Sequence, residues 1–157
     1  MSDIKFEKRK SVKQVEESTD LAPKFDRDGL IAVVTTDFSS GEVLMQGYMN
    51  EDALKKTISL GEAVYYSRSR KMLWHKGKTS GLIQKIKEIR IDDDQDCVWL
   101  RVEVHGGASC HVGYRSCFYR SVPFGKNNVV ATLNFEEKER VFDPVEVYGN
   151  APNPTKL

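Results

Sequence analysis

The apolar residues of this 157-residue chain occur only in short runs. The longest uninterrupted run, Leu30–Val34, has five residues, far fewer than the roughly 18 that a membrane-spanning helix needs. Its length and its branched side chains are typical of a buried strand. Because no segment carries the apolar core of a signal peptide, we expect a cytoplasmic protein with no membrane partner.

Most other apolar residues alternate with polar ones, as they do in strands of a half-buried sheet. The segments concerned are 42–48, 63–67, 83–91, 98–104, 129–133 and 140–145. One helix is clear: Asn50 is a typical N-cap, Ala53 and Leu54 begin an apolar stripe, and Gly61 suits the helix end. A shorter helical segment is indicated at 12–17. The pattern predicts an α+β domain with mainly antiparallel sheet and one clear helix.

Charge excludes one broad class of function. The chain has 24 Lys and Arg against 23 Asp and Glu, a net charge of +1, whereas nucleic-acid-binding domains carry a basic excess. We therefore expect no nucleic-acid partner. The polar residues 1–27 are predicted to form an N-terminal extension that lies over the domain or over a partner.

A run of aspartates, Asp92-Asp93-Asp94-Gln95-Asp96, is the first candidate site. On an extended strand Asp92, Asp94 and Asp96 would share one face and Asp93 would lie on the other. Three carboxylates on one face repel one another unless a hard cation such as Mg²⁺ lies among them. The alternative is a solvated acidic turn.

Two of the three cysteines form the second candidate site. Cys110 and Cys117 have six residues between them, and with an open coordination position they would suit a catalytic Zn²⁺. His111 is a zinc ligand, a general base or a hydrogen-bonded neighbour. Cys97 lies in an apolar strand, where a free cysteine is usually a small buried side chain.

A basic stretch at 68–81 is the third candidate site. It resembles a Walker A motif only in part, since Met72 stands where that motif needs glycine. The remaining donors suit phosphate groups, and the alternative is an ordinary basic surface loop. Trp74 either stacks on an adenine or fills the core. The candidate substrate-binding residues are Arg68, Arg70, Trp74, Lys76, Ser80 and Gly81.

Taken together, and in this order, the motifs resemble those of the phosphoribosyl-AMP cyclohydrolases of histidine biosynthesis. They are Gly29–Val34, Gly41–Met45, Tyr48–Asn50, Tyr66–Arg70, Trp74–Gly77, Ser80-Gly81, the aspartate run, Cys110-His111 and Ser116–Phe118. The resemblance covers about residues 28–121 and leaves 1–27 and 122–157 as N-terminal and C-terminal extensions. It implies an intertwined homodimer with active sites at the subunit interface, which opens the adenine ring of its nucleotide substrate at the N1–C6 bond with Zn²⁺ and Mg²⁺.

The resemblance also implies roles for single residues. Asp92, Asp94 and Asp96 match the magnesium carboxylates, and Cys110 and Cys117 match two of three zinc cysteines. Asp93 replaces the third, so a carboxylate either completes the zinc site or admits a harder ion such as Mn²⁺ or Fe²⁺. The phosphoribosyl groups are expected to meet Arg68, Arg70, Lys76 and the Ser80-Gly81 turn. His75 and His111 are the candidate catalytic proton carriers.

Two further departures affect the choice of substrate. Lys78 stands where the family has glutamate, and Val112 stands where it has threonine. Two other functions therefore stay open: a divergent paralogue that acts on another purine nucleotide, and a non-catalytic module that binds a nucleotide or a metal. The lost cysteine favours the non-catalytic module, whereas retention of three aspartates, two cysteines and the arginine pair disfavours it, because an idle site has no need for such a costly cluster of like charges.

Overall fold

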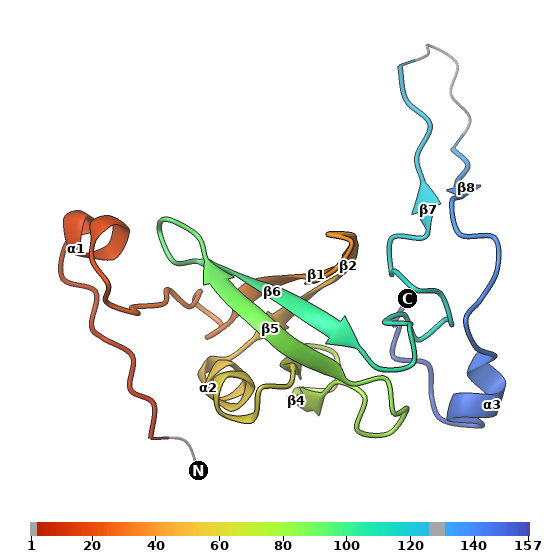
Figure 1. Cartoon of the computed structure of the whole chain (residues 1–157), viewed down its shortest axis with the longest axis horizontal. Coiled ribbons are helices and arrows are strands. Elements are labelled where there is room, and N and C mark those ends of the chain that lie inside the picture. The colour runs from red at the N-terminus through yellow and green to blue at the C-terminus, as the bar shows by residue number, and fades with distance from the viewer. Residues whose placement is uncertain (1–2, 126–130) are drawn as a thin grey trace.

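A four-stranded sheet organises the chain, of which the computed structural model describes residues 3–125 and 131–157 (Figure 1). Its strands are β1 (Ile31–Asp37), β2 (Val43–Met49), β5 (Gln84–Ile91) and β6 (Cys97–Val104), in the order β2-β1-β6-β5. The pairs β1–β2 and β5–β6 are antiparallel, whereas β1 and β6 run parallel. The α+β class is confirmed, but the sheet is mixed, because alternation predicts strands and not their neighbours.

The connection between the two hairpins contains the predicted helix, α2 (Glu51–Leu60). The Asn50 side chain accepts a 2.8 Å hydrogen bond from the Ala53 amide, and Gly61 ends the helix with a φ of 68°. Both boundary predictions are confirmed. The connection gives the chain the length it needs to bring β6 alongside β1 in parallel.

A second small sheet, β3 (Val64–Ser67) with β4 (Met72–His75), follows the helix. The sequence predicts β3, but it hides β4 inside the basic stretch, where charge dominates the pattern. The hairpin supplies Tyr65, which is 1% exposed, to the core. The Tyr65 hydroxyl lies 2.7 Å from Thr35 Oγ1 and donates to Gln84 Oε1 at 2.5 Å. This network ties β3 to both halves of the main sheet.

The apolar core lies between the main sheet, α2 and β3. Its buried members come from each of these elements, which is the arrangement that alternating strands and an amphipathic helix produce. They are Ile31, Val33, Leu44, Met45, Met49, Ala53, Leu54, Ala63, Val64, Tyr65, Val98, Leu100 and Val102.

The N-terminal segment lies against the body and carries the predicted short helix, α1 (Val12–Glu17). Phe6 and Phe25, before and after α1, pack on the core and lie with ring centroids 6.2 Å apart. Figure 1 shows α1 close to the turn between β5 and β6. The segment is therefore attached to the domain at both of its ends.

The C-terminal part differs from the prediction. The structure has β7 (Arg120–Ser121), β8 (Asn134–Phe135) and the helix α3 (Pro144–Tyr148). The predicted strand at 140–145 is wrong, because Asp143 caps α3 and Pro144 favours the first turn of a helix. Of the predicted strand at 129–133, Ala131–Leu133 is not a strand, and 129–130 lie outside the described residues. β7 and β8 project from the body (Figure 1).

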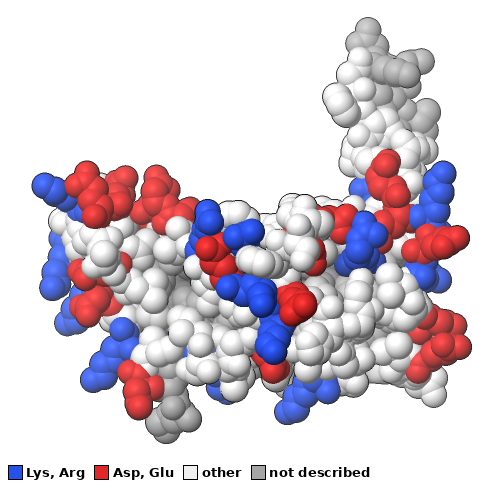
Figure 2. Space-filling model, viewed as in Figure 1, with Lys and Arg blue, Asp and Glu red and all other residues white. Residues whose placement is uncertain are grey.

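Charged side chains of both signs are interspersed over the face shown in Figure 2. This distribution agrees with the net charge of +1. Among the helices of 3–125 and 131–157, none combines the length and the apolar character that crossing a bilayer requires.

Candidate active site

The aspartate run forms the turn that joins β5 to β6. Asp92, Asp94 and Asp96 each offer a carboxylate oxygen, and these oxygens lie within 4.8 Å of one another. The predicted grouping is therefore confirmed, but the reason is a turn and not a strand face. Asp92 Oδ1 shapes this turn by accepting hydrogen bonds from the amides of Asp96 (2.9 Å) and Cys97 (3.0 Å).

The electrostatics of this turn suit a hard cation. Hydrogen bonding to the side chains of Asp92 and Asp94, together with their negative charge, raises the pKa of Asp96 to about 6. The repulsion among the three carboxylates raises this pKa. A divalent ion that prefers oxygen ligands would relieve that repulsion, because its positive charge would lie among them. The three aspartates thus have the chemistry and the grouping of a site that could hold a hard metal ion.

The thiol pair lies in the loop that follows β6. Cys110 is buried and Cys117 is exposed. The Gly113 amide donates to the Cys110 carbonyl oxygen at 3.0 Å, and the Cys117 amide donates to the Leu44 carbonyl oxygen at 2.7 Å. Gly113 has a φ of 104°, and a Cβ there would lie 2.4 Å from the Phe142 carbonyl oxygen. The loop conformation that brings the two cysteines together therefore depends on glycine.

The two thiols interact with each other. Hydrogen bonding between them lowers the pKa of Cys110 to about 6 and raises the pKa of Cys117. A thiolate is the form of cysteine that binds Zn²⁺. The pair fits two ligands of a zinc site, and within the described residues no third Cys, His, Asp or Glu of the same chain joins them.

Lys76 is buried beside the thiol pair, where it is 3% exposed. Its Nζ donates a 2.6 Å hydrogen bond to the Ser109 carbonyl oxygen and lies 5.0 Å from the Trp74 ring centroid. Burial lowers the pKa of Lys76, and the negative charge of Cys117 and Cys110 opposes that effect. Phosphate binding by Lys76 stays a prediction, but its surroundings associate it with the thiols.

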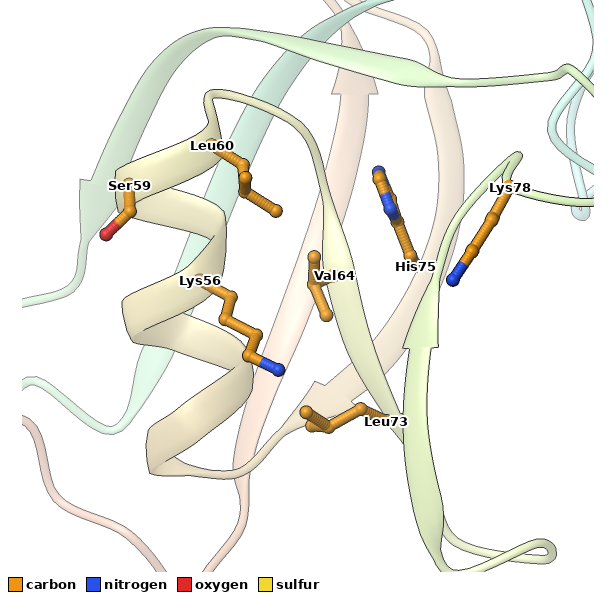
Figure 3. Close-up of a pocket in the computed structure, with 7 residues that line it drawn as sticks. All are labelled: Lys56, Ser59, Leu60, Val64, Leu73, His75 and Lys78. Atoms are coloured by element: carbon orange, nitrogen blue, oxygen red, sulfur yellow. The ribbon is translucent and has the colours of Figure 1, made fainter. Parts of the chain in front are cut away.

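The two candidate histidines have different neighbours. His111 is half-buried, and burial together with the charge of Lys76 lowers its pKa. His75 pairs with Glu62 through a 2.8 Å contact from Nε2 to Oε1. Figure 3 shows His75 on β4 facing a pocket beside α2. The volume of this pocket is about 430 Å³. The pocket is lined by Lys56, Ser59, Leu60, Val64, Leu73, His75 and Lys78. Of the two histidines, His111 is the one that follows a thiol in the sequence and lies within the electrostatic influence of Lys76.

The candidate phosphate-binding donors lie in two turns. Arg68 and Arg70 belong to the exposed turn between β3 and β4, where the Arg68 guanidinium lies 4.1 Å from the Tyr48 ring centroid. Ser80 and Gly81 belong to the turn after β4, in which the Gly81 amide donates to the Gly77 carbonyl oxygen at 2.7 Å. The arginine side chains are exposed and have positive charge available for an anion. Their predicted role remains open to test.

The acidic turn and the thiol pair lie at opposite ends of β6 (Figure 1). An eight-residue strand spans about 25 Å at roughly 3.3 Å per residue, so Asp93 does not reach the thiols of its own chain. Asp93 also lies outside the group formed by Asp92, Asp94 and Asp96. The residues expected to bind zinc are thus divided between two ends of one subunit.

Comparison with known proteins decides the family. The phosphoribosyl-AMP cyclohydrolase family matches residues 45–119. A protein of that name from Rhodopseudomonas palustris (strain TIE-1) is 53% identical over 135 residues, 86% of this chain and 89% of the relative. One from Nitrobacter winogradskyi is 51% identical over 139 residues, 88% of this chain and 94% of the relative. The chain belongs to the phosphoribosyl-AMP cyclohydrolase family.

The region that matches the phosphoribosyl-AMP cyclohydrolase family contains every candidate site residue from Arg68 to Cys117. The 135 aligned residues of the first relative exceed the length of 28–121. Similarity to these cyclohydrolases therefore continues into the segments treated above as extensions.

Sequence reasoning missed two residues that contact the candidate site of this cyclohydrolase-family chain. Gln95 is 4% exposed although Asp92, Asp94 and Asp96 around it are exposed, and Ser109 holds Lys76. Gln95 has a visible signal, since it is the only uncharged residue in the run 92–96. Ser109 has none, because its contact joins residues far apart in the chain.

Proposed function

We propose that this chain, as a homodimer, hydrolyses the N1–C6 bond in the adenine ring of 1-(5-phosphoribosyl)-AMP during histidine biosynthesis, with Zn²⁺ and Mg²⁺. Family membership supports the reaction, since relatives that share half of their residues with this chain are named for it. The observation that carries the proposal is the pair of interacting thiols, Cys110 and Cys117, beside buried Lys76. Such a pair has the chemistry of a zinc site and little purpose as core packing.

The zinc site would be completed across the dimer. Cys110 and Cys117 of one subunit would bind the ion with Asp93 of the partner subunit, because Asp93 and the thiols lie at opposite ends of β6 within one chain. A carboxylate oxygen is an acceptable zinc ligand. Asp92, Asp94 and Asp96 would bind Mg²⁺ on the same turn, so the dimer would also bring the two metals together.

Exposed apolar side chains support an intertwined dimer. The segment that follows Cys117 carries Phe118 at 59% exposure, Phe124 at 89% and Phe135 at 51%. Aromatic side chains so exposed on one projecting segment are typical of a surface that another chain covers. Because this segment begins next to the thiol pair, a partner that covers it would lie near the zinc ligands.

The chemistry follows from the substrate. An adenine alkylated at N1 is cationic and electrophilic at C6, so water adds its oxygen to C6, the C6–N1 bond breaks and N1 takes up a proton. Zn²⁺ held by these ligands would supply a water molecule whose pKa is lowered to about 7. His111, whose pKa is lowered by burial and by Lys76, is neutral near pH 7 and can accept a proton on a ring nitrogen. His75 is the second candidate for that role.

The exposed cations would orient the substrate. Arg68 and Arg70 flank the β3–β4 turn and, with the Ser80-Gly81 turn, would bind the two phosphoribosyl groups. Trp74 lies 5.0 Å from Lys76 Nζ and 5.7 Å from the Arg70 guanidinium, between the phosphate-binding candidates and the thiol pair. An adenine that reaches toward the zinc ligands would pack on this ring.

The test is elemental analysis of the purified protein together with an assay of phosphoribosyl-AMP opening on the same sample. About one zinc per chain with turnover supports the proposal, and turnover restored by Mn²⁺ or Fe²⁺ without zinc keeps the reaction but changes the metal. Bound metal without turnover points to another purine nucleotide, which Lys78 in place of glutamate would favour. Absence of both metal and turnover would reject the proposal that this chain is an enzyme.

A further inference from the structure

We propose that residues 9–24, here called the N-terminal clamp, position the acidic turn for its metal, with Gln95 and Arg9 as the positioning residues. This inference rests on the proposed function, because it takes Asp92, Asp94 and Asp96 as the magnesium ligands. It assigns a role to a segment that contributes no metal ligand of its own.

The Gln95 side chain is the central contact. It lies between two aspartates, yet it is buried and points into the clamp. Its Oε1 accepts a 2.8 Å hydrogen bond from the Ala22 amide. Its Nε2 donates to the carbonyl oxygens of Val15 (2.9 Å) and Asp20 (3.1 Å). The amide is thus bound on both its donor side and its acceptor side, which fixes its orientation.

Backbone groups of the turn are held as well. The Lys24 amide donates to the Gln95 carbonyl oxygen at 2.7 Å. Arg9 Nη2 donates to the Asp94 carbonyl oxygen at 2.9 Å, while its Nη1 donates to the Ala22 carbonyl oxygen at 2.6 Å. Arg9, near the start of the clamp, therefore links Ala22, near its end, to Asp94, one of the proposed magnesium ligands.

These contacts hold an unfavourable backbone conformation. Gln95 has a φ of 57°, in the left-handed region that side chains other than glycine rarely adopt. That conformation reverses the chain within the turn and lets Asp94 and Asp96 bring their carboxylates next to Asp92. Three mutually repelling carboxylates would separate in a free loop, so the clamp keeps them at the spacing a cation needs.

The clamp is itself fixed to the body of the protein. Phe6 precedes it and Phe25 follows it, and both pack on the core. Gln14 Nε2 donates to the carbonyl oxygen of Lys8, just before the clamp (2.9 Å), and to Asp20 Oδ2 within it (3.0 Å). Because the clamp is anchored to the core on both sides, it can restrain the conformation of the acidic turn. Residues that orient metal ligands in this way typically change metal affinity by about 10–100-fold when removed.

The experiment is a calorimetric titration of Mg²⁺ into the full-length, zinc-loaded protein and its variants. For Gln95→Ala we expect Mg²⁺ affinity to fall by about ten-fold or more. The matched control is Gln46→Ala, which removes an exposed glutamine whose side chain donates to the adjacent Gly47 carbonyl oxygen; its affinity should equal that of the wild type. Equal affinity of folded Gln95→Ala and wild type overturns the inference.

Arg9 provides an independent variant if Gln95→Ala does not fold. Arg9→Ala should bind Mg²⁺ several-fold more weakly, and Arg9→Lys, which retains the charge and one donor nitrogen, should recover part of the loss. Lys10→Ala controls for the lost charge, since Lys10 is exposed in the same segment. An Arg9→Ala affinity equal to that of Lys10→Ala overturns the inference.

A second readout separates this inference from the proposed function. Coupling between two sites is reciprocal, so Mg²⁺ should slow amide hydrogen exchange at Ala22 and Lys24 in the wild type. Binding of Mg²⁺ without such protection overturns the clamp and leaves the magnesium site intact. Wild-type protein that binds no Mg²⁺ overturns the magnesium site, and the clamp with it.

Discussion

Lys76 donates a 2.6 Å hydrogen bond from Nζ to the carbonyl oxygen of Ser109, the residue directly before Cys110. This contact places a buried ammonium group beside the thiols of Cys110 and Cys117. The positive charge favours the thiolate, and the hydrogen bond fixes the backbone from which the first thiol projects. Lys76 therefore acts on the thiol pair through both charge and position.

Replacing Lys76 by methionine should raise the pKa of the Cys110 thiol. In the wild type this pKa is lowered to about 6, first by the hydrogen bond from Cys117 and in part by Lys76; loss of a close opposite charge is worth about one unit or more. The measurement is thiolate ultraviolet absorbance of the zinc-free protein against pH. Lys78→Met, which removes an exposed lysine two residues away, should leave the midpoint unchanged. Equal midpoints for Lys76→Met and wild type would contradict the prediction.

Asp96→Asn should stabilise the metal-free protein and weaken its binding of Mg²⁺. The pKa of Asp96 is raised from 3.8 to about 6 in the folded state. Above pH 6, ionising this group therefore costs more free energy in the folded state than in the unfolded state. That cost disappears as the pH falls below 3.8, where both states are protonated. Thermal unfolding with a chelator should thus show a higher melting temperature for Asp96→Asn above pH 6 and no difference in acid. Added Mg²⁺ should reverse the order; a variant less stable than wild type without metal would refute the argument.

Local features could be predicted from the sequence, and long-range ones could not. Asn50 and Gly61 delimit α2 as predicted, because capping and the left-handed end depend on the residues themselves. The aspartates do come together, but through a turn with a positive φ at Gln95, which alternation along a strand cannot anticipate. The burial of Lys76 depends on a loop more than 30 residues away, and a lysine in a basic stretch gives no sign of it.

Tyr65→Phe should destabilise the fold by about 1–3 kcal/mol, because it leaves buried Thr35 and Gln84 with unsatisfied polar atoms. Burial raises the pKa of Tyr65, so the hydroxyl stays neutral and the loss should not depend on pH near neutrality. Urea denaturation at equilibrium gives the difference. Tyr66→Phe, on the same strand but only half-buried, should change stability much less. Equal losses for both variants would mean that the hydrogen bonds of Tyr65 contribute little.

If the partner subunit completes the zinc site, activity requires ligands from two chains. Asp93→Ala and Cys110→Ala should each lack activity as homodimers, because every site loses one ligand. A mixed dimer of the two variants contains one site with the intact thiol pair of the first subunit and Asp93 of the second, and one site that lacks both. With random assortment in a two-fold symmetric dimer, an equal mixture should recover about a quarter of wild-type activity.

The mixture is made by unfolding the two variants together and refolding them with zinc, and activity and bound zinc are then compared with those of each variant treated alone. Cys97→Ala serves as the control for cysteine removal, since Cys97 lies at the start of β6, away from the thiol pair of its own chain. Recovery in the mixture requires ligands from two chains. Activity that remains at the level of the separate variants, in a mixture where wild-type protein refolds fully, would place Asp93 outside the zinc site.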